Sequence, residues 1–174
     1  MNKFPDLKKF SHLSSTFFGV GLLPKAPGTW GSFAALFLFF GLIYLQICFL
    51  LYFLFVIFFS IASIIICEIA SKDLVEKDQK TIVIDEVAGA GLSFLFIPLL
   101  GIYNFSTLEW QKESYLAALI LIILFRFFDI LKPYPISFID REFKSGFGIV
   151  LDDLVAGVFA GLTLLGGNFF FQIF

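Results

Sequence analysis

Residues 33–67 read FAALFLFFGLIYLQICFLLYFLFVIFFSIASIIIC, and this stretch contains no charged side chain. A membrane-spanning helix needs about 20 apolar residues to cross a hydrocarbon core of ~30 Å, because each residue adds ~1.5 Å along the helix axis. The stretch is therefore too long for one helix. We expect two antiparallel helices that turn near Leu45–Ile47, the first of them short and either tilted or re-entrant.

The composition places the rest of the chain in a membrane as well. Of its 174 residues, 59% are hydrophobic, 20% are aromatic and 15% are charged, whereas a soluble domain has roughly 45–50% apolar and about 25% charged residues. A single soluble core of this length could not remove so much apolar surface from water. We therefore exclude a soluble cytosolic enzyme, a disordered chain and a nucleic-acid-binding protein. The formal net charge of -2 gives no reason to expect a polyanionic partner.

Cysteine and histidine chemistry is excluded too. Cys48 and Cys67 both lie in apolar runs, and the one histidine, His12, lies near the N-terminus. These positions provide no disulfide framework, no paired metal ligands and no cysteine-based phosphatase loop.

Three more apolar runs follow the hairpin, over residues 87–103, 115–128 and 149–171, so we expect about five transmembrane helices, two of them short. The basic residues test this count. With a hairpin at 33–67, eleven of the twelve Lys and Arg residues fall on one side of the membrane and Lys112 falls on the other. The positive-inside rule makes the basic side cytoplasmic. The eleven residues are Lys3, Lys8, Lys9, Lys25, Lys72, Lys77, Lys80, Arg126, Lys132, Arg141 and Lys144.

We expect one all-α integral membrane domain, residues 1–174, built as a compact bundle of about five transmembrane helices. Its parts are an interfacial N-terminal segment (1–18), a glycine-rich loop (19–32) and the helical bundle (33–171), within which 133–147 form an interfacial cytoplasmic loop. The first segment has apolar residues at near-helical spacing among Lys and Ser, which is typical of an amphipathic interfacial helix. The cytoplasmic loop is too polar to span a membrane.

Five carboxylates stand at the ends of three expected helices. Asp85 and Glu86 begin the third helix, Asp129 ends the fourth, and Asp152 and Asp153 begin the fifth. By the topology above, all five lie at the cytoplasmic rim. Separate helix caps and surface charges are the alternative interpretation, because acids favour helix N-termini, but this does not explain Asp129 at a C-terminus. Acids at such positions are costly and indicate function.

Small residues follow two of these acids at helical spacing. Asp85 and Asp153 are each followed by small residues at i+4 and i+8, a pattern that lets membrane helices approach closely. Such an approach would bring the two carboxylates together, although ordinary helix packing explains the pattern as well. The small residues are Gly89, Ser93, Gly157 and Gly161.

Clustered acids need cations to neutralise them. A set of oxygen ligands without His or Cys suits a hard cation, Mg²⁺ first and Mn²⁺ second. Because Mg²⁺ commonly takes phosphate oxygens as further ligands, the set points to a phosphorylated substrate. Ion pairs to Arg126 and Lys132 are the competing use of these acids, and Arg126 and Asp129 share one helix face.

The expected phosphate-binding half of the site is the loop GVGLLPKAPGTWGS, residues 19–32. Backbone N–H groups at a helix N-terminus can bind an anion, and Lys25, Thr29 and Ser32 would add donors. A turn that enters the membrane, with Ser32 as the helix cap, explains the loop equally well. Further candidate phosphate ligands are Arg126, Lys132 and Arg141.

Four sequence blocks resemble the bacterial phosphatidylglycerophosphatase A family. They are PKAPGTWGS (24–32), IDEVAG (84–89), RFFDILKPYPI (126–136) and GIVLDDLVAG (148–157), and they occur in the family's order. The similarity runs from about residue 19 to 161. Matched by motif, the family's metal-binding and catalytic acids fall on Asp85, Glu86, Asp129, Asp152 and Asp153, and its recurrent polar positions on Arg126, Lys132 and Asp140.

The resemblance implies an Mg²⁺-dependent phosphatase of the bacterial inner membrane that converts phosphatidylglycerol phosphate into phosphatidylglycerol at the cytoplasmic face of the lipid bilayer. Attack by metal-activated water fits the acids, and a phospho-aspartyl intermediate is the rival mechanism. The competing classes are a carboxylate-lined transporter or channel, another Mg²⁺-dependent lipid headgroup enzyme and a purely structural subunit. The number of metal ions, the identity of the base, the range of lipids and the oligomeric state are left open.

Overall fold

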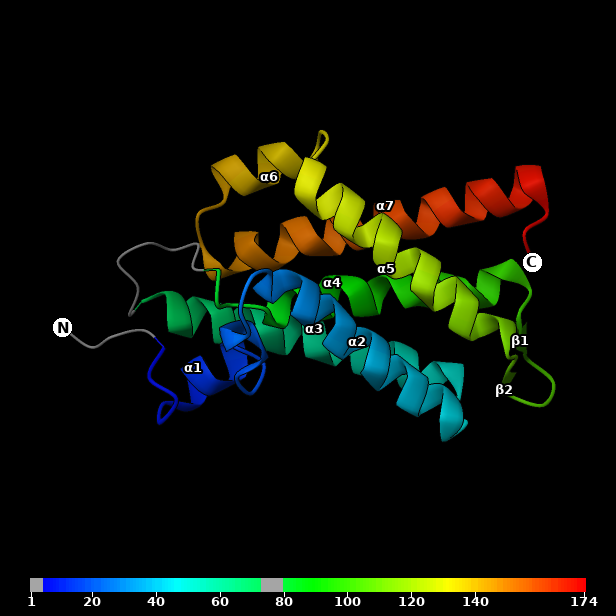
Figure 1. Cartoon of the computed structure of the whole chain (residues 1–174), viewed down its shortest axis with the longest axis horizontal. Coiled ribbons are helices and arrows are strands. Elements are labelled where there is room, and N and C mark those ends of the chain that lie inside the picture. The colour runs from blue at the N-terminus through cyan, green and yellow to red at the C-terminus, as the bar shows by residue number, and fades with distance from the viewer. Residues whose placement is uncertain (1–4, 73–79) are drawn as a thin grey trace.

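The computed structural model describes residues 5–72 and 80–174, which form the all-α membrane bundle that the sequence predicts (Figure 1). Lys3 and Lys77, two of the residues assigned to the cytoplasmic side, lie outside these ranges. Within them, four helices are long and apolar enough to span a membrane. They are α2 (Pro27–Tyr44), α3 (Phe49–Ser71), α5 (Glu113–Leu131) and α7 (Gly146–Phe171).

α2 and α3 form the predicted hairpin, and the turn between them covers residues 45–48. α2 has 18 residues and is long enough to span. The turn between α2 and α3 contacts a short β-hairpin made of β1 (Tyr103–Asn104) and β2 (Glu109–Trp110). The indole Nε1 of Trp110 donates to the carbonyl oxygen of Ile47 at 2.7 Å. This hydrogen bond joins the β-hairpin to the turn between α2 and α3.

The remaining apolar run crosses with fewer residues than any of these four helices. α4 (Ile84–Ser93) continues without a break into the 3-10 helix η2 (Phe94–Leu100). At ~1.5 Å per α-helical residue and ~2.0 Å per 3-10 residue, the two together extend roughly 29 Å. This length matches a hydrocarbon core of ~30 Å, so α4 and η2 supply the expected fifth crossing.

Two expected loops are partly helical. α2 begins at Pro27, so residues 27–32 of the predicted glycine-rich loop are helical, because proline has the backbone angle of a first helical turn and lacks only an N–H that the helix does not need there. The predicted loop 133–147 contains the short helix α6 (Ile136–Glu142), and α7 begins inside it at Gly146. The Ser145 side chain caps α7 by accepting from the backbone N–H of Gly148.

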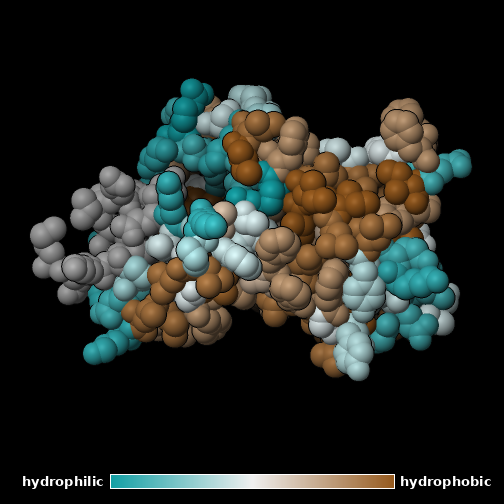
Figure 2. Space-filling view, viewed as in Figure 1, coloured by the Kyte–Doolittle hydropathy of each residue, from teal (hydrophilic) through white to brown (hydrophobic). Residues whose placement is uncertain are grey.

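The helices run side by side along the long axis of the molecule, and its two ends differ (Figure 1). The short helix α1 (Phe10–Ser15), the turn η1 (Val20–Leu22) and α6 lie toward one end, while β1, β2 and the C-terminus lie at the other. Apolar residues dominate the middle of the face seen in Figure 2, and hydrophilic residues gather toward its two ends. This distribution is the one expected of a bundle that crosses a bilayer.

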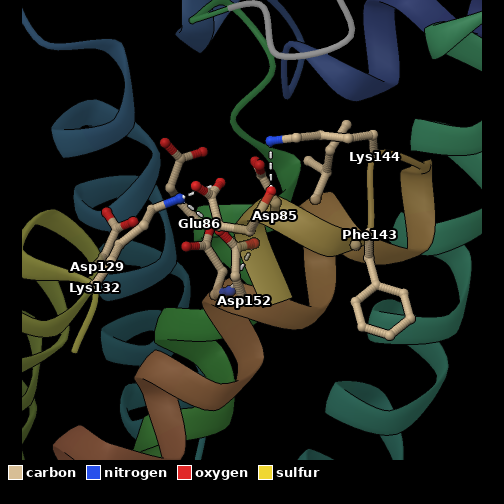
Figure 3. A pocket seen from close by; sticks show the side chains of 11 residues that line it. Asp85, Glu86, Asp129, Lys132, Phe143, Lys144 and Asp152 are labelled. Carbon is tan, nitrogen blue, oxygen red and sulfur yellow. Dashed lines mark hydrogen bonds and ion pairs between the residues drawn. The ribbon is translucent and has the colours of Figure 1, made fainter. Parts of the chain in front are cut away.

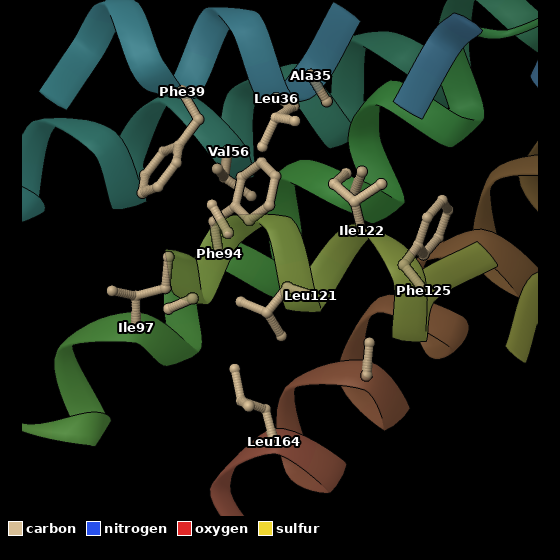
Figure 4. Close-up of a cluster of buried hydrophobic side chains, with 14 of the residues drawn as sticks. Ala35, Leu36, Phe39, Val56, Phe94, Ile97, Leu121, Ile122, Phe125 and Leu164 are labelled. Atoms are coloured by element: carbon tan, nitrogen blue, oxygen red, sulfur yellow. The ribbon is translucent and has the colours of Figure 1, made fainter. Parts of the chain in front are cut away.

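α4 and η2 lie inside the bundle and contact α2, α3, α5 and α7. Phe39 of α2 stacks on Phe94 of η2 with ring centroids 4.5 Å apart, and Leu121 of α5 lies nearby in the same buried cluster (Figure 4). All three side chains are almost completely buried. Aromatic and aliphatic side chains therefore fill the middle of the bundle.

The glycine stripes of α4 and α7 face each other, as the sequence predicts. A Cβ atom on Gly89 would lie 2.5 Å from the carbonyl oxygen of Asp153, and one on Gly157 would overlap the carbonyl oxygen of Gly89. Only glycine allows two helix backbones to come this close. The crossing places the acid that begins each stripe, Asp85 on α4 and Asp153 on α7, at the same end of the bundle.

Glu68 near the end of α3 fixes the start of α7. Its Oε2 atom accepts a hydrogen bond from the backbone N–H of Gly146 at 2.7 Å, one of the N–H groups that a helix leaves unpaired. We expect Glu68→Ala to lower the free energy of unfolding by about 1 kcal/mol, which shifts the thermal midpoint by roughly 2–4 °C. Thermal unfolding of the purified protein in detergent measures this. Glu68→Gln keeps an acceptor and should recover most of the loss; an alanine variant that melts with the wild type contradicts the assignment.

Candidate active site

A cavity of about 540 Å³ opens at the end of the bundle that carries α6. Its size is within the range of roughly 300–1,000 Å³ that is usual for small-ligand sites. The first turn of α4, the end of α5, α6 with the residues after it, and the first two turns of α7 form its walls. The eleven lining residues, six of them carboxylates, are Asp85, Glu86, Asp129, Lys132, Asp140, Phe143, Lys144, Gly148, Ile149, Asp152 and Asp153 (Figure 3).

Three of the carboxylates are close enough to share one ion. One oxygen each from Asp85, Glu86 and Asp153 lies within 4.8 Å of the other two. Mg²⁺ binds oxygen at about 2.0–2.1 Å, so two oxygens on opposite sides of one ion are about 4.2 Å apart. A small inward movement of these side chains would complete such a set.

Two of these carboxylates each have a buried oxygen that no described residue satisfies. Oδ1 of Asp85 and Oε2 of Glu86 are buried and accept no hydrogen bond from the described residues. Asp85 and Asp153 are 9% and 4% exposed. Burying unpaired carboxylates of like charge is costly unless a cation or proton compensates them. The residues present therefore fit a bound cation.

Arg126 connects the acids of α4 and α5. Its Nη1 atom lies 2.5 Å from Oδ2 of Asp129 and 3.9 Å from Oε1 of Glu86. The pair with Asp129 is the i, i+3 contact that the sequence predicts on this helix. Arg126 therefore compensates part of the negative charge and orients Asp129 toward the cavity.

Lys132 connects α5, α6 and α7. Its Nζ atom donates to Asp140 at 2.8 Å and to Asp152 at 2.7 Å. Burial alone would lower the pKa of Lys132, but the hydrogen bonds and the negative charge of the two carboxylates outweigh burial and raise the pKa above its ordinary value. Lys132 is therefore a fixed positive charge beside the carboxylates.

The structure brings all five predicted acids to this cavity, with one difference in helix position. Asp85 and Glu86 lie in the first turn of α4 and Asp129 lies in the last turn of α5, as expected. Asp152 and Asp153 lie in the second turn of α7, because that helix begins earlier than the apolar run alone suggests.

Five of the six predicted phosphate ligands do not line the cavity. Arg126 is one of them, although it contacts Glu86 and Asp129, which do line it. Ser32 is fully buried and donates to the carbonyl oxygen of Gly28 within α2, because the helix already includes both residues. Lys25 is exposed at positive φ, and Nε of Arg141 donates to the backbone carbonyl oxygen of Ser137. Thr29 lies in the first turn of α2.

The glycine-rich segment contributes to the site through close packing instead. A Cβ atom on Gly28 would overlap Oε1 of Glu86 and would lie 2.9 Å from Nη1 of Arg126. The missing side chain therefore leaves room for these two charged groups beside α2.

The predicted site residues do not include Phe143 and Lys144, which also line the cavity. Asp140 entered only as a position matched in the resemblance. No fixed spacing marks Lys144, because it lies after the end of α6 at Glu142 and reaches the cavity through the packing of α6 and α7.

A sequence model of the family described as phosphatidylglycerophosphatase A matches residues 13–168, a range that includes every residue of the cavity wall. The chain belongs to this family. The relationship predicted from the four sequence blocks is thus confirmed. Family membership makes the chain a phosphatase, and its cavity is the candidate active site.

Known relatives agree with this membership. A protein named phosphatidylglycerophosphatase A from Haemophilus influenzae is 38% identical over 172 residues, which cover 94% of this chain and 95% of the relative. A protein of the same name from Escherichia coli K12 is 36% identical over 158 residues, covering 90% and 83%. A putative phosphatidylinositol-3-phosphatase from Bacteroides thetaiotaomicron is 32% identical over 159 residues, covering 87% and 89%. No solved structure matches the chain.

Proposed function

We propose that this phosphatase removes the terminal phosphate of phosphatidylglycerol phosphate, releasing phosphatidylglycerol and inorganic phosphate, and that it requires Mg²⁺. The observation that carries the proposal is the set of carboxylate oxygens from Asp85, Glu86 and Asp153 inside the cavity of a chain from this family. The relatives from Haemophilus influenzae and Escherichia coli carry the name of that activity.

Asp85, Glu86 and Asp153 would hold the cation, and Asp129 and Asp152 lie beside them. When bound there, Mg²⁺ offsets the charge of the carboxylates, so that an anionic phosphate can enter, and lowers the pKa of a bound water. The cavity wall has six carboxylates and two lysines, so its negative charge would repel a phosphate unless a cation is bound.

The protein's own groups can move the protons of the hydrolysis. The oxygen of water forms a bond to phosphorus while the bond between phosphorus and the glycerol oxygen breaks, so the water loses a proton and the glycerol oxygen gains one. A cavity carboxylate that is not holding the cation can accept the first proton. Lys132, on the cavity wall, can stabilise the charge on the equatorial phosphate oxygens, and Arg126 holds Asp129 from behind.

We place the active site at the cytoplasmic face of a bacterial inner membrane. Arg126, Lys132 and Lys144 lie at the cavity end of the bundle, whereas Lys112 lies at the other end of α5. Positive residues favour the cytoplasmic side. A lipid headgroup at that face would lie level with the cavity.

The transporter alternative has less support. A conducting path would place carboxylates near the bilayer midplane, but the described cavity acids lie at one end. The middle of the bundle is filled by buried apolar side chains such as Phe39, Phe94 and Leu121.

The test is phosphate release from phosphatidylglycerol phosphate by the purified full chain in detergent. We expect release with Mg²⁺, loss of release in EDTA and recovery when Mg²⁺ is restored. Phosphatidylinositol 3-phosphate serves as the comparison substrate, because one relative carries that name. A run with labelled substrate, quenched during turnover, should leave no label on the protein if water attacks directly.

Each outcome decides a separate part of the proposal. No release from folded protein with Mg²⁺ present overturns the activity, and undiminished release in EDTA overturns the metal requirement. If phosphate is released faster from phosphatidylinositol 3-phosphate, that lipid takes the place of phosphatidylglycerol phosphate as the proposed substrate. If acid-stable label is found on an aspartate, the reaction proceeds through a phospho-aspartyl intermediate and not by direct attack of water.

A further inference from the structure

Lys144 is the one lysine on the described cavity wall whose charge no carboxylate compensates. Its Nζ atom donates to the backbone carbonyl oxygen of Asp140 at 2.6 Å, and it forms no ion pair with an acid of the described residues. An ammonium group has three donors, so at least two remain for another acceptor. The side chain is exposed and lines the cavity.

Lys132 differs in each of these respects. It is half-buried and shared between Asp140 and Asp152. Figure 3 shows the two lysines on opposite sides of the carboxylates, with Lys132 on the α5 side and Lys144 on the side of Phe143. The acids of the cavity thus lie between Lys132, which is paired with carboxylates, and Lys144, which is not.

The Lys144 side of the cavity is also its apolar edge. Phe143 lines the cavity, and its ring lies 6.3 Å from that of Phe147. Both rings are exposed. Exposed Phe side chains near the end of a membrane bundle can bury their rings at the boundary between headgroups and acyl chains. A lipid bound here would therefore direct its chains toward Phe143 and Phe147.

We propose that Lys144 binds the phosphodiester of the substrate, so that the cavity recognises a lipid with two phosphates rather than any phosphate monoester. The inference rests on the proposed function, which places the terminal phosphate at Asp85, Glu86 and Asp153. The phosphodiester joins the headgroup glycerol to the acyl-bearing glycerol, so it lies between the terminal phosphate and the chains. Lys144 lies on the same side of the acids as Phe143 (Figure 3), so it is placed to meet a phosphodiester on the side toward which the chains would extend.

The test compares Lys144→Met with Lys72→Met. Lys72 is an exposed lysine at the end of α3 and does not line the cavity, so it controls for general loss of positive charge. Because Lys144→Met removes a charge-assisted hydrogen bond, we expect KM for phosphatidylglycerol phosphate to rise about tenfold, equivalent to about 1.4 kcal/mol. We expect kcat within about twofold of wild type. Lys144→Arg should stay near wild type, and so should Lys72→Met.

Two inhibitors separate the two phosphate positions. Short-chain phosphatidylglycerol carries only the phosphodiester, and its inhibition should weaken about tenfold in Lys144→Met. Inorganic phosphate mimics only the terminal group, and its inhibition should not change. Binding of short-chain phosphatidylglycerol, measured by calorimetry in detergent with Mg²⁺ present, gives a readout that needs no turnover.

The inference is overturned if Lys144→Met binds phosphatidylglycerol as tightly as wild type, or if inhibition by inorganic phosphate weakens equally. It is also overturned if Lys72→Met shows the same loss. Failure of the proposed function looks different, because then the wild type releases no phosphate from phosphatidylglycerol phosphate. Weaker phosphatidylglycerol binding by Lys144→Met would in that case still support a phosphodiester site at Lys144.

Discussion

Asp153→Asn should reduce phosphate release by at least about 10³-fold, equivalent to about 4 kcal/mol of transition-state stabilisation. The change keeps the size of the side chain and removes the charge of one of the three carboxylates that lie within 4.8 Å. Phosphate release and Mg²⁺ dependence, measured at saturating lipid, test this. Loss of Mg²⁺ affinity should accompany loss of rate.

The same variant should fold at least as well as the wild type. Asp153 is 4% exposed and shares its surroundings with Asp85 and Asp152, so removing its charge relieves repulsion when no metal is bound. We expect the thermal midpoint in EDTA to be equal or higher. Glu142→Gln, an exposed acid of α6 outside the cavity, is the control and should change neither property. An Asp153→Asn protein that fails to fold, or that keeps more than a tenth of wild-type activity, contradicts the role given to this carboxylate.

Gly157→Ala should destabilise the bundle strongly for a change of one methyl group. The added Cβ would overlap the carbonyl oxygen of Gly89, and neither backbone can move without separating α4 from α7. Overpacking of this kind costs about 1–3 kcal/mol, or roughly 2–12 °C in the thermal midpoint. Activity should fall as well, because the shift moves Asp153 away from Asp85. Thermal unfolding and phosphate release in detergent measure the two effects.

Gly166→Ala on the same helix is the matched control. A Cβ at this position would meet no neighbouring atom within 4 Å, and alanine is a better helix former than glycine by about 0.5–1 kcal/mol. It should leave activity unchanged and raise the thermal midpoint slightly. If both variants melt alike, the close contact between α4 and α7 does not stabilise the bundle.

Much of the architecture follows from residue types alone. The uncharged length of 33–67 requires two crossings, and the structure has the turn at residues 45–48. The small residues at i+4 and i+8 after Asp85 and Asp153 predict a close helix crossing, which the structure contains. These features can be predicted from the sequence because the helix period and the membrane thickness constrain them directly.

The phosphate-binding side was harder to predict, because the relevant contacts are tertiary. A glycine-rich loop with Lys25, Thr29 and Ser32 looks like an anion site in isolation, but Pro27 begins a helix that turns Ser32 toward its own backbone. Lys144 becomes recognisable only when α6 and α7 are placed around one cavity. Side chains that meet through packing of distant elements leave no fixed spacing in a sequence.

The separate origins of the acids also determine when the site exists during synthesis of the chain. Asp85 and Glu86 come from α4, Asp129 comes from α5, and the other two acids come from α7, which is made after both. Before α7 is inserted, the glycine face of α4 lacks the helix that it packs against, and the acids of α4 lack the third carboxylate. The nascent protein is therefore incomplete as an enzyme until α7 has entered the membrane, and any chain truncated before Gly146 lacks Asp152 and Asp153.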